Sequence, residues 1–422
     1  MSWDVAVIGA GYVGLPLAQT FAEAGQKVVL VDVVDSIVDA LNRGESHIGD
    51  VPTESLKPLV KSGAITATTD YSVVRDSDAI LLAVPTPLSR QREPDLSHIE
   101  SAARSVAPHL RAGHVVILES TTYPGTTREI LLPLLEEGSG LKAGADFHVA
   151  FSPERVDPGN REFTTKTTPK IVGGIDEASA EAAASLYRKA IDEVHTVSTP
   201  EAAELTKLLE NIFRSVNIAL VNELAQLCDR MRVDVWEVVE AAATKPFGFM
   251  SFKPGPGLGG HCLPVDPFYL AWKAREFDFY TEFIELAGKV NENMPYFCLE
   301  KITRALNSQE KSVKGSRVHL VGVAYKADVG DLRESPALKL IELLRDEGAE
   351  LSYHDPHVPE LPEHGLASQE LDDSLANADC VAIVTAHSGI DYEQLAERSR
   401  LVVDFRNATG ENGSANGRVW KL

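Results

Sequence analysis

The sequence predicts an α/β protein with two doubly wound parallel sheets joined by a long central helix. Three observations lead to this fold class: short apolar runs alternate with helical stretches in the first 200 residues, a long helical stretch follows, and the alternation restarts near residue 314. A chain of 422 residues also exceeds what one core usually holds. We therefore expect three parts, residues 1–198, 199–305 and 306–422.

The first part of the chain shows the pattern of alternating strands and helices. Apolar runs that predict strands span residues 4–8, 28–31, 79–84, 115–118 and 148–151, and most of them end in turn sequences. Strands separated by helices predict a parallel sheet that is covered on both faces.

The first of these strands runs directly into a glycine-rich turn. Gly9, Gly11 and Gly14 occupy the G-x-G-x-x-G positions between a strand and a helix. Glycine at these positions allows a tight turn, a close approach of a pyrophosphate to the backbone, and close helix–strand packing. Asp32 ends the second strand, where a carboxylate binds ribose hydroxyls and repels a 2′-phosphate. The motif predicts a Rossmann-like domain that binds NAD rather than NADP; a glycine turn without a ligand is the alternative.

Two later strands are followed by hydroxyl side chains. Pro85 and Thr86 follow the apparent third strand, and Thr121 follows the fourth. Ligands of such sheets bind outside the carboxyl ends of the strands, so both threonines are placed to touch a cofactor or a catalytic water. Capping of the turns at the strand ends explains them equally well.

Residues 199–239 show a helical pattern without a breaker, with Pro200 near its start. So many positions are apolar that we expect a helix buried on more than one side, either as an internal connector or also as a dimer interface. Lys207 and Asn211 lie four residues apart and share one face, where they could stabilise an oxyanion. Glu204 and Glu210 nearby support the alternative, an ordinary solvated stripe.

A segment rich in glycine and proline, residues 254–260, leads into His261 and Cys262. A cysteine retained for packing would more naturally lie in an apolar periodic run, so this position favours a nucleophilic thiol. Asp266 follows four residues later, within reach of a water or substrate at the sulfur. A loop thiol without a role and a partly buried small residue are the alternatives. We interpret His261 as a loop side chain rather than a base.

The third part restarts the α/β pattern, with apolar runs at residues 317–323, 351–353, 380–385 and 401–403. The turn after the first of these runs begins at Gly322 but lacks the second and third glycines. We therefore expect a second Rossmann-like domain that does not carry the dinucleotide.

Composition excludes several classes of function. A net charge of −22 disfavours nucleic acid and anionic membranes as partners, and no apolar run is long enough to span a bilayer. The four cysteines are widely separated, which argues against a zinc site or a disulfide framework, and no metal is expected. The N-terminus has no basic region before an apolar stretch. A reduced cytoplasm fits these features.

At this point the motifs identify a resemblance that covers nearly the whole chain. The matching segments are Gly9-x-Gly11-Tyr12-Val13-Gly14, Val84-Pro85-Thr86-Pro87, Ser120-Thr121-Thr122-Tyr123-Pro124-Gly125, Phe151-Ser152-Pro153-Glu154-Arg155, Gly259-Gly260-His261-Cys262-x-Pro264-x-Asp266 and Tyr325-Lys326-x-Asp328-x-x-Asp331-x-Arg333. With these segments the sequence resembles the UDP-glucose/GDP-mannose dehydrogenase family, which implies two Rossmann-like domains and a central helix that also dimerises.

The resemblance implies a four-electron oxidation of a UDP-sugar C6 alcohol to a carboxylate, with two NAD per turnover. By position, Cys262 would form a thiohemiacetal and then a thioester. Asp266 would activate or orient the hydrolytic water with help from Thr121, and Lys207 and Asn211 would stabilise the C6 oxyanion.

Further roles follow from the same resemblance. Glu154 aligns with an acidic acid/base candidate, whereas a second family carboxylate meets Pro158 here, with Asp157 as a possible stand-in. The remaining binding residues implied by position fall into two groups. NAD would be bound by Gly9, Gly11, Tyr12, Val13, Gly14, Asp32, Pro85, Thr86, Thr121 and Arg333, and the substrate by Glu154, Arg155, Lys207, Asn211, Gly259, Lys326 and Arg406.

The substrate prediction rests on two segments. UDP-glucose and GDP-mannose members usually have Ser before the cysteine, whereas Gly259-Gly260-His261-Cys262 is similar to the branch acting on UDP-N-acetylhexosamines. Residues 245–250 are similar to the members of that branch that act on UDP-N-acetylglucosamine. We predict UDP-N-acetylglucosamine, with UDP-N-acetylmannosamine and then UDP-glucose as alternatives. A dehydrogenase that transfers a single hydride and a catalytically inactive nucleotide-sugar binder are the other hypotheses.

Overall fold

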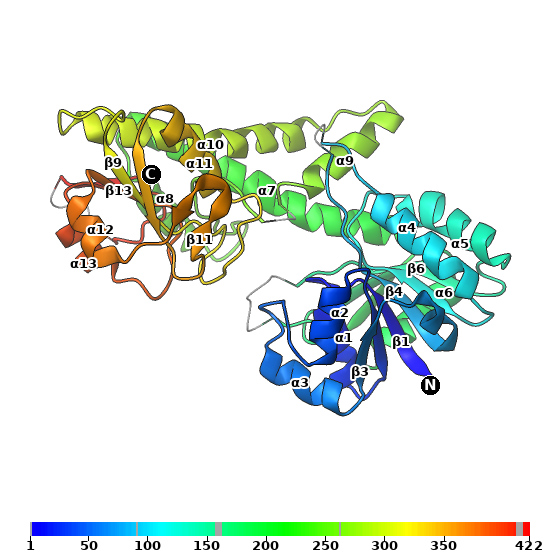
Figure 1. The fold of residues 1–422 in the computed structure, drawn as a ribbon. Coiled ribbons are helices and arrows are strands. Elements are labelled where there is room, and N and C mark those ends of the chain that lie inside the picture. The colour runs from blue at the N-terminus through cyan, green and yellow to red at the C-terminus, as the bar shows by residue number, and fades with distance from the viewer. Residues whose placement is uncertain (1, 90–91, 157–162, 261–262, 411–416) are drawn as a thin grey trace. The chain divides into compact units, whose positions relative to one another are not determined.

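The computed structural model describes residues 2–89, 92–156, 163–260, 263–410 and 417–422. The chain divides into two compact units (Figure 1). Unit 1 comprises Met1–Glu210 and Phe268–Tyr280, and unit 2 comprises Asn211–Pro267 and Thr281–Leu422.

Unit 1 is built on an eight-stranded sheet, and its strand order is β3-β2-β1-β4-β5-β6-β7-β8. Neighbouring strands are parallel except for the antiparallel pair β6–β7. The five strands expected from the sequence are confirmed, although the one predicted at 79–84 starts and ends two residues earlier; β3, β7 and β8 were not predicted. The bounds are β1 Trp3–Ile8, β2 Val28–Val31, β3 Ile65–Thr68, β4 Ser77–Leu82, β5 Val115–Leu118, β6 His148–Phe151, β7 Lys170–Gly174 and β8 Val194–Val197.

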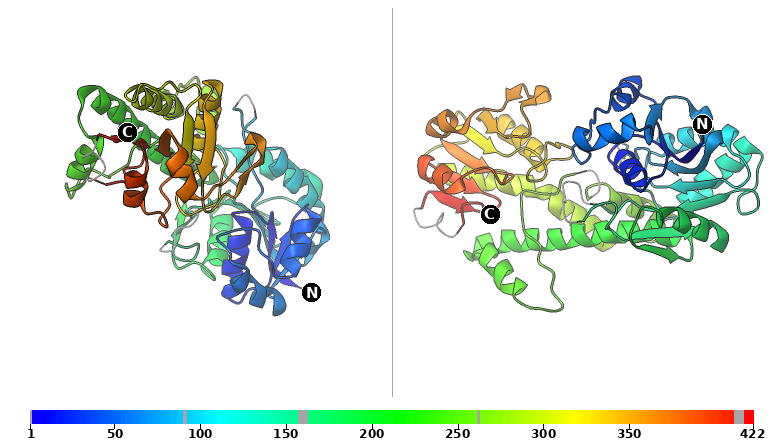
Figure 2. Two further views of the ribbon diagram at one scale, coloured as in Figure 1. Left: turned by 60° about the vertical axis from the view of Figure 1, so that its left-hand side comes forward. Right: turned by 90° about the horizontal axis from the view of Figure 1, so that it is seen from below.

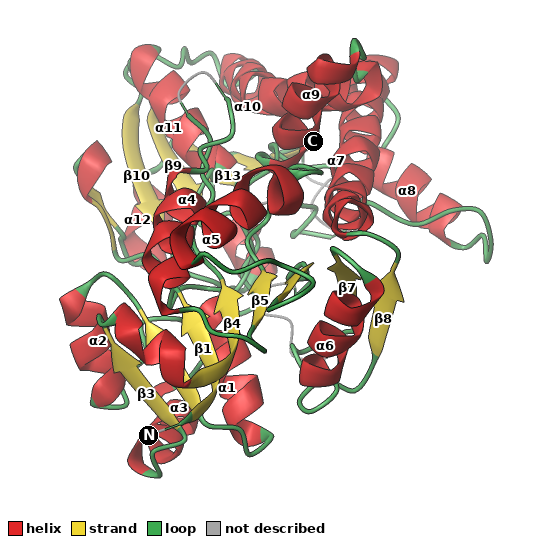
Figure 3. Cartoon of the chain, turned by 90° about the vertical axis from the view of Figure 1, so that its right-hand side faces the viewer, coloured by secondary structure: helices red, strands yellow, loops and turns green. Residues whose placement is uncertain are grey.

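Helices cover both faces of this sheet, which explains why the central strands are almost entirely apolar (Figure 3). One core contains residues of α1, α2, α3 and α6, and the core on the opposite face contains residues of α4 and α5. The bounds are α1 Gly14–Glu23, α2 Asp35–Asn42, α3 Thr53–Lys61, α4 Ser97–Val106, α5 Leu132–Ser139, α6 Glu177–Tyr187 and α9 Asp266–Ala274.

The long helix α7, Pro200–Met231, begins in unit 1 and ends in unit 2. The expectation of a continuous helical stretch to residue 239 is wrong, because Arg232 adopts a left-handed conformation with φ of 59° and Asp234 caps a new helix, α8 Val235–Ala243. Its apolar residues are also not all buried within the chain, since Leu209, Leu220 and others are exposed. Among the described residues no helix has the length and apolarity to cross a membrane.

Unit 2 contains a five-stranded parallel sheet of order β10-β9-β13-β14-β15. The helix α10 contributes to the core on one face, and α12 and α13 contribute to the core on the other (Figure 2). The four expected strands are confirmed with small shifts of their ends, and β15 was not predicted. The bounds are α10 Glu282–Asn307, β9 Arg317–Val321, α11 Pro336–Asp346, β10 Glu350–His354, β11 Glu360–Leu361, β12 Leu366–Ala367, α12 Leu371–Asn377, β13 Cys380–Ile383, α13 Tyr392–Arg398, β14 Val402–Asp404 and β15 Val419–Lys421.

Candidate active site

The glycine turn between β1 and α1 leaves little choice of side chain at two of its three positions. Gly9 has φ of +100°, and a Cβ there would lie 2.6 Å from the carbonyl oxygen of Ala83. A Cβ on Gly14 would lie 1.8 Å from the carbonyl oxygen of Gly9. By contrast, no heavy atom of the described chain lies within 4 Å of a Cβ built on Gly11. The backbone at Gly11 is therefore open to a close ligand.

Asp32 follows β2, and its carboxylate is held against the same turn. Its Oδ2 accepts a hydrogen bond from Ala10 N at 2.9 Å, and its Oδ1 accepts one from Val34 N at 3.0 Å. Within the described residues no side chain caps the first turn of α1, whose N-cap position is Val13, and the preceding Tyr12 is exposed. An uncapped helix N-terminus beside an open glycine and a carboxylate that follows the second strand fits the pyrophosphate and ribose of NAD.

The residues after β4 and β5 lie at the carboxyl edge of the sheet, as expected. Thr86 is buried, and its carbonyl oxygen accepts a hydrogen bond from Tyr269 Oη at 2.9 Å. Pro85 is exposed and Thr121 is half-buried. Ser120 Oγ donates to Val84 O at 2.7 Å and so joins the two strand ends.

Glu154 lies just beyond the end of β6 and is held from two sides. Its Oε1 accepts hydrogen bonds from Arg155 N and Val156 N, both at 2.8 Å, and its Oε2 lies 3.5 Å from Lys170 Nζ. Burial raises the pKa of Glu154, but Lys170, the two N–H groups and Lys207 together bring that pKa below its ordinary value. Glu154 is therefore a carboxylate rather than a carboxylic acid at neutral pH.

Arg155 points its guanidinium at α7 rather than into open solvent. Its Nη2 lies 2.6 Å from Glu210 Oε1, and its Nη1 donates to Pro169 O at 2.6 Å. Asp157 and Pro158, which follow, lie outside the described residues.

The face of α7 that carries the predicted polar residues is buried, so the alternative of a solvated stripe is wrong. Lys207 is 7% exposed and Asn211 is 2% exposed. Asn211 Nδ2 donates to Asp266 Oδ2 at 2.5 Å, and Asn211 Oδ1 accepts from Arg214 Nη2 at 2.8 Å. Two of the residues expected to be catalytic, Asn211 and Asp266, are therefore in direct contact.

Glu204, one turn before Lys207, is also fully buried. Its carboxylate accepts hydrogen bonds from Gly125 N at 2.6 Å, Thr127 N at 2.9 Å and Thr127 Oγ1 at 2.7 Å. Burial raises the pKa of Glu204 to about 7, and these hydrogen bonds oppose that rise. Glu204 thereby ties α7 to the segment that follows Thr121.

Cys262 and His261 lie outside the described residues, but the loop that leads to them is defined. A Cβ on Gly259 would lie 2.5 Å from Tyr325 Cβ, and one on Gly260 would lie 2.9 Å from Tyr325 Cε2. Gly260 N donates to Arg333 O at 2.9 Å. The two glycines before His261 and Cys262 are thus required by close packing against Tyr325, a contact that sequence reasoning did not anticipate.

A second support for this loop was also missed. Gly255 N donates to the side chain of Asn222 on α7 at 2.9 Å. Asn222 in turn donates to Asn291 on α10 at 2.9 Å, and Asn291 donates to Ser215 O at 3.1 Å. Asn222 and Asn291 are buried, and this burial is the feature that distinguishes the chain of hydrogen bonds from ordinary surface contacts. The burial of a single polar residue cannot be predicted from a sequence, so this support was missed.

The three cations expected to bind ligands in unit 2 have different surroundings. Arg333 pairs with Asp331 through Nη2 at 2.6 Å. Arg406 Nε donates to Val384 O at 2.8 Å, and a Cβ on Gly255 would lie 2.6 Å from Arg406 Nη1. Burial lowers the pKa of Arg406, although the group stays a cation. Lys326 is half-buried in the loop after β9.

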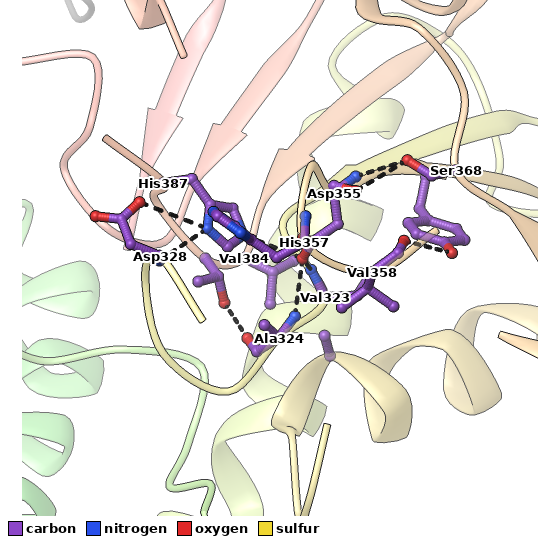
Figure 4. A network of polar contacts seen from close by, with 12 residues as sticks. Val323, Ala324, Asp328, Asp355, His357, Val358, Ser368, Val384 and His387 are labelled. Atoms are coloured by element: carbon purple, nitrogen blue, oxygen red, sulfur yellow. Dashed lines mark hydrogen bonds and ion pairs between the residues drawn. The ribbon is translucent and has the colours of Figure 1, made fainter. Parts of the chain in front are cut away.

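A polar network lies at the carboxyl edge of the sheet in unit 2 (Figure 4). In the described part of the chain, three side chains of metal-ligating types lie close enough to one another to hold a metal ion: Asp328, His357 and His387. However, His387 Nδ1 accepts a hydrogen bond from Asp328 N at 3.0 Å, and Nε2 lies 3.0 Å from Asp355 Oδ2. Both ring nitrogens of His387 are therefore engaged within the protein, and the group is a hydrogen-bond network rather than an open set of ligands.

The sheet, the glycine turn and Asp32 define unit 1 as the cofactor domain of an NAD-dependent dehydrogenase. Three models of the UDP-glucose/GDP-mannose dehydrogenase family match this sequence. They are its NAD binding domain over residues 3–191, its central domain over residues 201–293 and its UDP binding domain over residues 319–411. The chain belongs to the UDP-glucose/GDP-mannose dehydrogenase family, and it is an NAD-dependent nucleotide-sugar dehydrogenase.

Curated relatives and solved structures agree with this assignment. The chain is 37% identical over 413 residues to UDP-N-acetyl-D-mannosamine dehydrogenase from Pyrococcus horikoshii, which covers 96% of each chain. It is 35% identical to the Escherichia coli K12 protein of the same name, over 91% of this chain and 93% of that one. The solved structure of the Pyrococcus horikoshii enzyme matches with a TM-score of 0.90 at 34% identity, over 99% of this chain and 98% of that one. NDP-N-acetyl-D-galactosaminuronic acid dehydrogenase from Methanosarcina mazei Go1 matches with a TM-score of 0.84 at 33% identity, over 100% and 95%.

Proposed function

We propose that this enzyme oxidises the C6 alcohol of a UDP-N-acetylhexosamine to the carboxylate and consumes two NAD per sugar. The observation that carries the proposal is the buried polar face of α7, where Asn211 contacts Asp266, four residues after Cys262. A buried ammonium (Lys207), amide (Asn211) and carboxylate (Asp266), together with a cysteine four residues before that carboxylate in the sequence, are the groups that oxidation through a thiol adduct requires.

NAD accepts a hydride at each of the two oxidation stages. In unit 1 it would be held by Gly9, Gly11, Gly14 and Asp32, with Tyr12, Val13, Pro85, Thr86 and Thr121 beside it. Arg333 is the predicted contribution of unit 2. The burial of the strands that these residues follow supports a fixed site rather than a flexible one.

The chain's own residues divide the chemistry between two stages. Glu154, held as a carboxylate, accepts the proton of the C6 hydroxyl in the first stage. The Cys262 thiolate then adds to the aldehyde carbon and forms a thiohemiacetal, whose oxidation gives a thioester. Asp266 takes a proton from the water that cleaves the thioester, with Thr121 orienting that water. Lys207 and Asn211 donate hydrogen bonds to the C6 oxygen whenever it carries negative charge.

The UDP moiety would be bound in unit 2. Lys326 and Arg406 supply the cations suited to a diphosphate, and the close contact of Arg406 with Gly255 links that site to the loop that leads to Cys262. Gly259 and Arg155 remain predicted substrate contacts.

The identity of the hexosamine is the finer question. Residues 245–250 led us to predict UDP-N-acetylglucosamine, and that prediction is untested. The names of the relatives favour UDP-N-acetylmannosamine, which differs from it only in configuration at C2. We therefore put the manno isomer first and the gluco isomer second.

The test is the amount of NADH formed from a limiting nucleotide sugar with excess NAD, assayed in parallel for the manno and gluco isomers and UDP-glucose. Two NADH per sugar would establish the substrate and the double oxidation. One NADH per sugar would mean that the product is an aldehyde and would contradict the thioester route. Cys262→Ser with unchanged turnover would contradict it as well.

We also propose that the enzyme is a homodimer through α7. Seven exposed apolar side chains recur at spacings of three, four or seven residues along this helix and so form one stripe. They are Leu205, Leu209, Phe213, Leu220, Leu224, Leu227 and Met231. Light scattering should give a dimer mass for the wild type and for Leu220→Met, and a monomer mass for the double variant Leu220→Glu/Leu224→Glu. A monomeric wild type would exclude the dimer.

A further inference from the structure

A buried lysine in unit 1 plays no part in the chemistry described so far. Lys170 begins β7 and is 3% exposed. Its Nζ lies 2.7 Å from Glu119 Oε2 and 3.5 Å from Glu154 Oε2, and 5.3 Å from the centre of the Tyr187 ring. The ammonium thus lies between Glu119, which follows β5, and Glu154, which lies three residues beyond the end of β6.

The cluster contains more acids than cations. Glu119 is buried and accepts a hydrogen bond from Tyr187 Oη, so its negative charge has Lys170 as its close cation. Glu154 is influenced by Lys170 from β7, by Lys207 from α7, and by the N–H groups of Arg155 and Val156. The charged and titratable groups around Glu154 are therefore Lys170, Glu119, Tyr187 and Lys207.

This environment shifts the pKa values of the two carboxyl groups in opposite directions. Burial raises the pKa of Glu119, and Lys170 only partly offsets that rise. For Glu154, the opposing charges and N–H groups outweigh burial and lower the pKa. A proton that enters the cluster therefore goes to Glu119 first, and Glu154 keeps its negative charge beside Lys170.

We propose that Lys170 is a positioning residue of the active site, which keeps Glu154 ionised and directed so that it can accept the proton of the C6 hydroxyl. The proposal rests on the role given to Glu154 under the proposed function. Lys170 itself does not touch the reacting atoms. It acts by holding one oxygen of Glu154 while two backbone N–H groups hold the other.

The alternative is that Lys170 merely joins β5, β6 and β7. Two substitutions separate these roles, because both break the Lys170–Glu119 pair but only one removes the cation. Lys170→Met removes the ammonium that lies 3.5 Å from Glu154 Oε2, so the acidic limb of the kcat/KM profile should move up by about 1–3 pH units. Glu119→Gln keeps the cation and should not move that limb upward. Lys170→Arg should restore most of the wild-type profile.

A readout that does not need activity uses thermal melting in the Glu119→Gln background, where Glu154 is the remaining carboxylate of the cluster. In Lys170→Met/Glu119→Gln the pKa of Glu154 is raised in the folded protein, so stability is lost as pH rises. We expect the melting midpoint to fall between about pH 5 and about pH 8, whereas Glu119→Gln alone shows no such fall. Adding Glu154→Gln should abolish it.

Lys142→Met is the matched control, since it removes a lysine from the exposed Lys142–Glu136 pair of the same unit and should change neither readout. The proposal would be overturned if Lys170→Met and Glu119→Gln had equal pH profiles of kcat/KM. It would also be overturned if the melting midpoint had the same pH dependence in Lys170→Met/Glu119→Gln as in Glu119→Gln. A wild type that forms no NADH with any nucleotide sugar would contradict the proposed function instead, and the melting series would still decide whether Lys170 controls Glu154.

Discussion

In both units the first strand of the main sheet is followed by a glycine with positive φ, Gly9 in unit 1 and Gly322 in unit 2. Each glycine is fixed by a neighbouring strand, because a Cβ would lie 2.6 Å from Ala83 O in one case and 2.1 Å from Thr385 O in the other. Each turn is also held by an aspartate that follows the second strand. Asp32 accepts from Ala10 N, and Asp355 accepts from Val323 N at 2.7 Å.

Beyond these shared contacts the two turns are used differently. In unit 1, α1 begins five residues after Gly9, and Asp32 is partly exposed. In unit 2, α11 begins only at Pro336, after a long loop, and Ser335 caps it. Asp355 is buried and also contacts His387. The same strand–turn–strand geometry thus leaves its aspartate partly exposed in unit 1, whereas in unit 2 the aspartate is buried and satisfied internally.

The largest expected effect is a loss of stability, and it is expected at Gly14, where the turn of unit 1 is tightly packed. Alanine normally stabilises a helix relative to glycine by about 0.5–1 kcal/mol, but at Gly14 its Cβ would lie 1.8 Å from a backbone oxygen. We expect Gly14→Ala to destabilise unit 1 by about 3 kcal/mol or more, measured by chemical denaturation.

Gly11→Ala is the control for this change, since no heavy atom of the described chain lies near the added Cβ. Its stability should match the wild type while the KM for NAD rises, because the methyl group occupies the space that a pyrophosphate would enter. Equal stability of the two variants would contradict the packing argument.

The next effect concerns Asp355. Burial would raise its pKa, but His387 and three backbone N–H groups bring it to about 2 from an ordinary 3.8. Because the pKa is lowered on folding, Asp355 contributes roughly 2 kcal/mol above about pH 4, and this contribution is lost as pH falls toward 2. Asp355→Asn should lower the melting temperature of unit 2 at neutral pH and flatten its acid dependence between pH 4 and pH 2. An unchanged acid dependence would show that Asp355 does not support the turn electrostatically.

The corresponding change in unit 1 should affect the cofactor instead. Asp32→Asn removes the charge that repels a 2′-phosphate, so the ratio of kcat/KM for NAD over NADP should fall about tenfold. Asp35→Asn removes an exposed acid three residues later and should leave the ratio unchanged. A loss of stability without a change in the ratio would mean that Asp32 acts as Asp355 does.

Much of this contrast could be predicted from the sequence. The glycine spacing and the acid at residue 32 indicated the cofactor turn, and the missing glycines after Gly322 indicated a second domain without a dinucleotide. Both signals are local, because they depend on backbone conformation within a few residues. The end of α7 was missed for the opposite reason, since Arg232 adopts a left-handed conformation that its residue type does not favour.

The contacts that support the site could not be predicted in the same way. Lys170 lies 51 residues from Glu119 in sequence, and Asn222 lies 69 residues from Asn291. Such pairs depend on which strands and helices become neighbours, and the sequence specifies that only through the whole fold. The roles assigned to Cys262, Asp266 and the other site residues stay predictions.

The smallest expected effect lies at the two helix N-termini. Ser335 Oγ accepts a hydrogen bond from Ala337 N at 3.3 Å and donates one to Val323 O at 2.7 Å, so it closes the turn of unit 2 onto its helix. Removing such a cap costs about 1 kcal/mol, and Ser335→Ala should lower the stability of unit 2 by that amount without changing the KM for NAD. Val13→Asp would place a carboxylate at the N-terminus of α1, where it should weaken NAD binding while leaving the stability of unit 1 unchanged or slightly higher. If Val13→Asp left the KM for NAD unchanged, the uncapped turn of α1 would not be the site of the pyrophosphate.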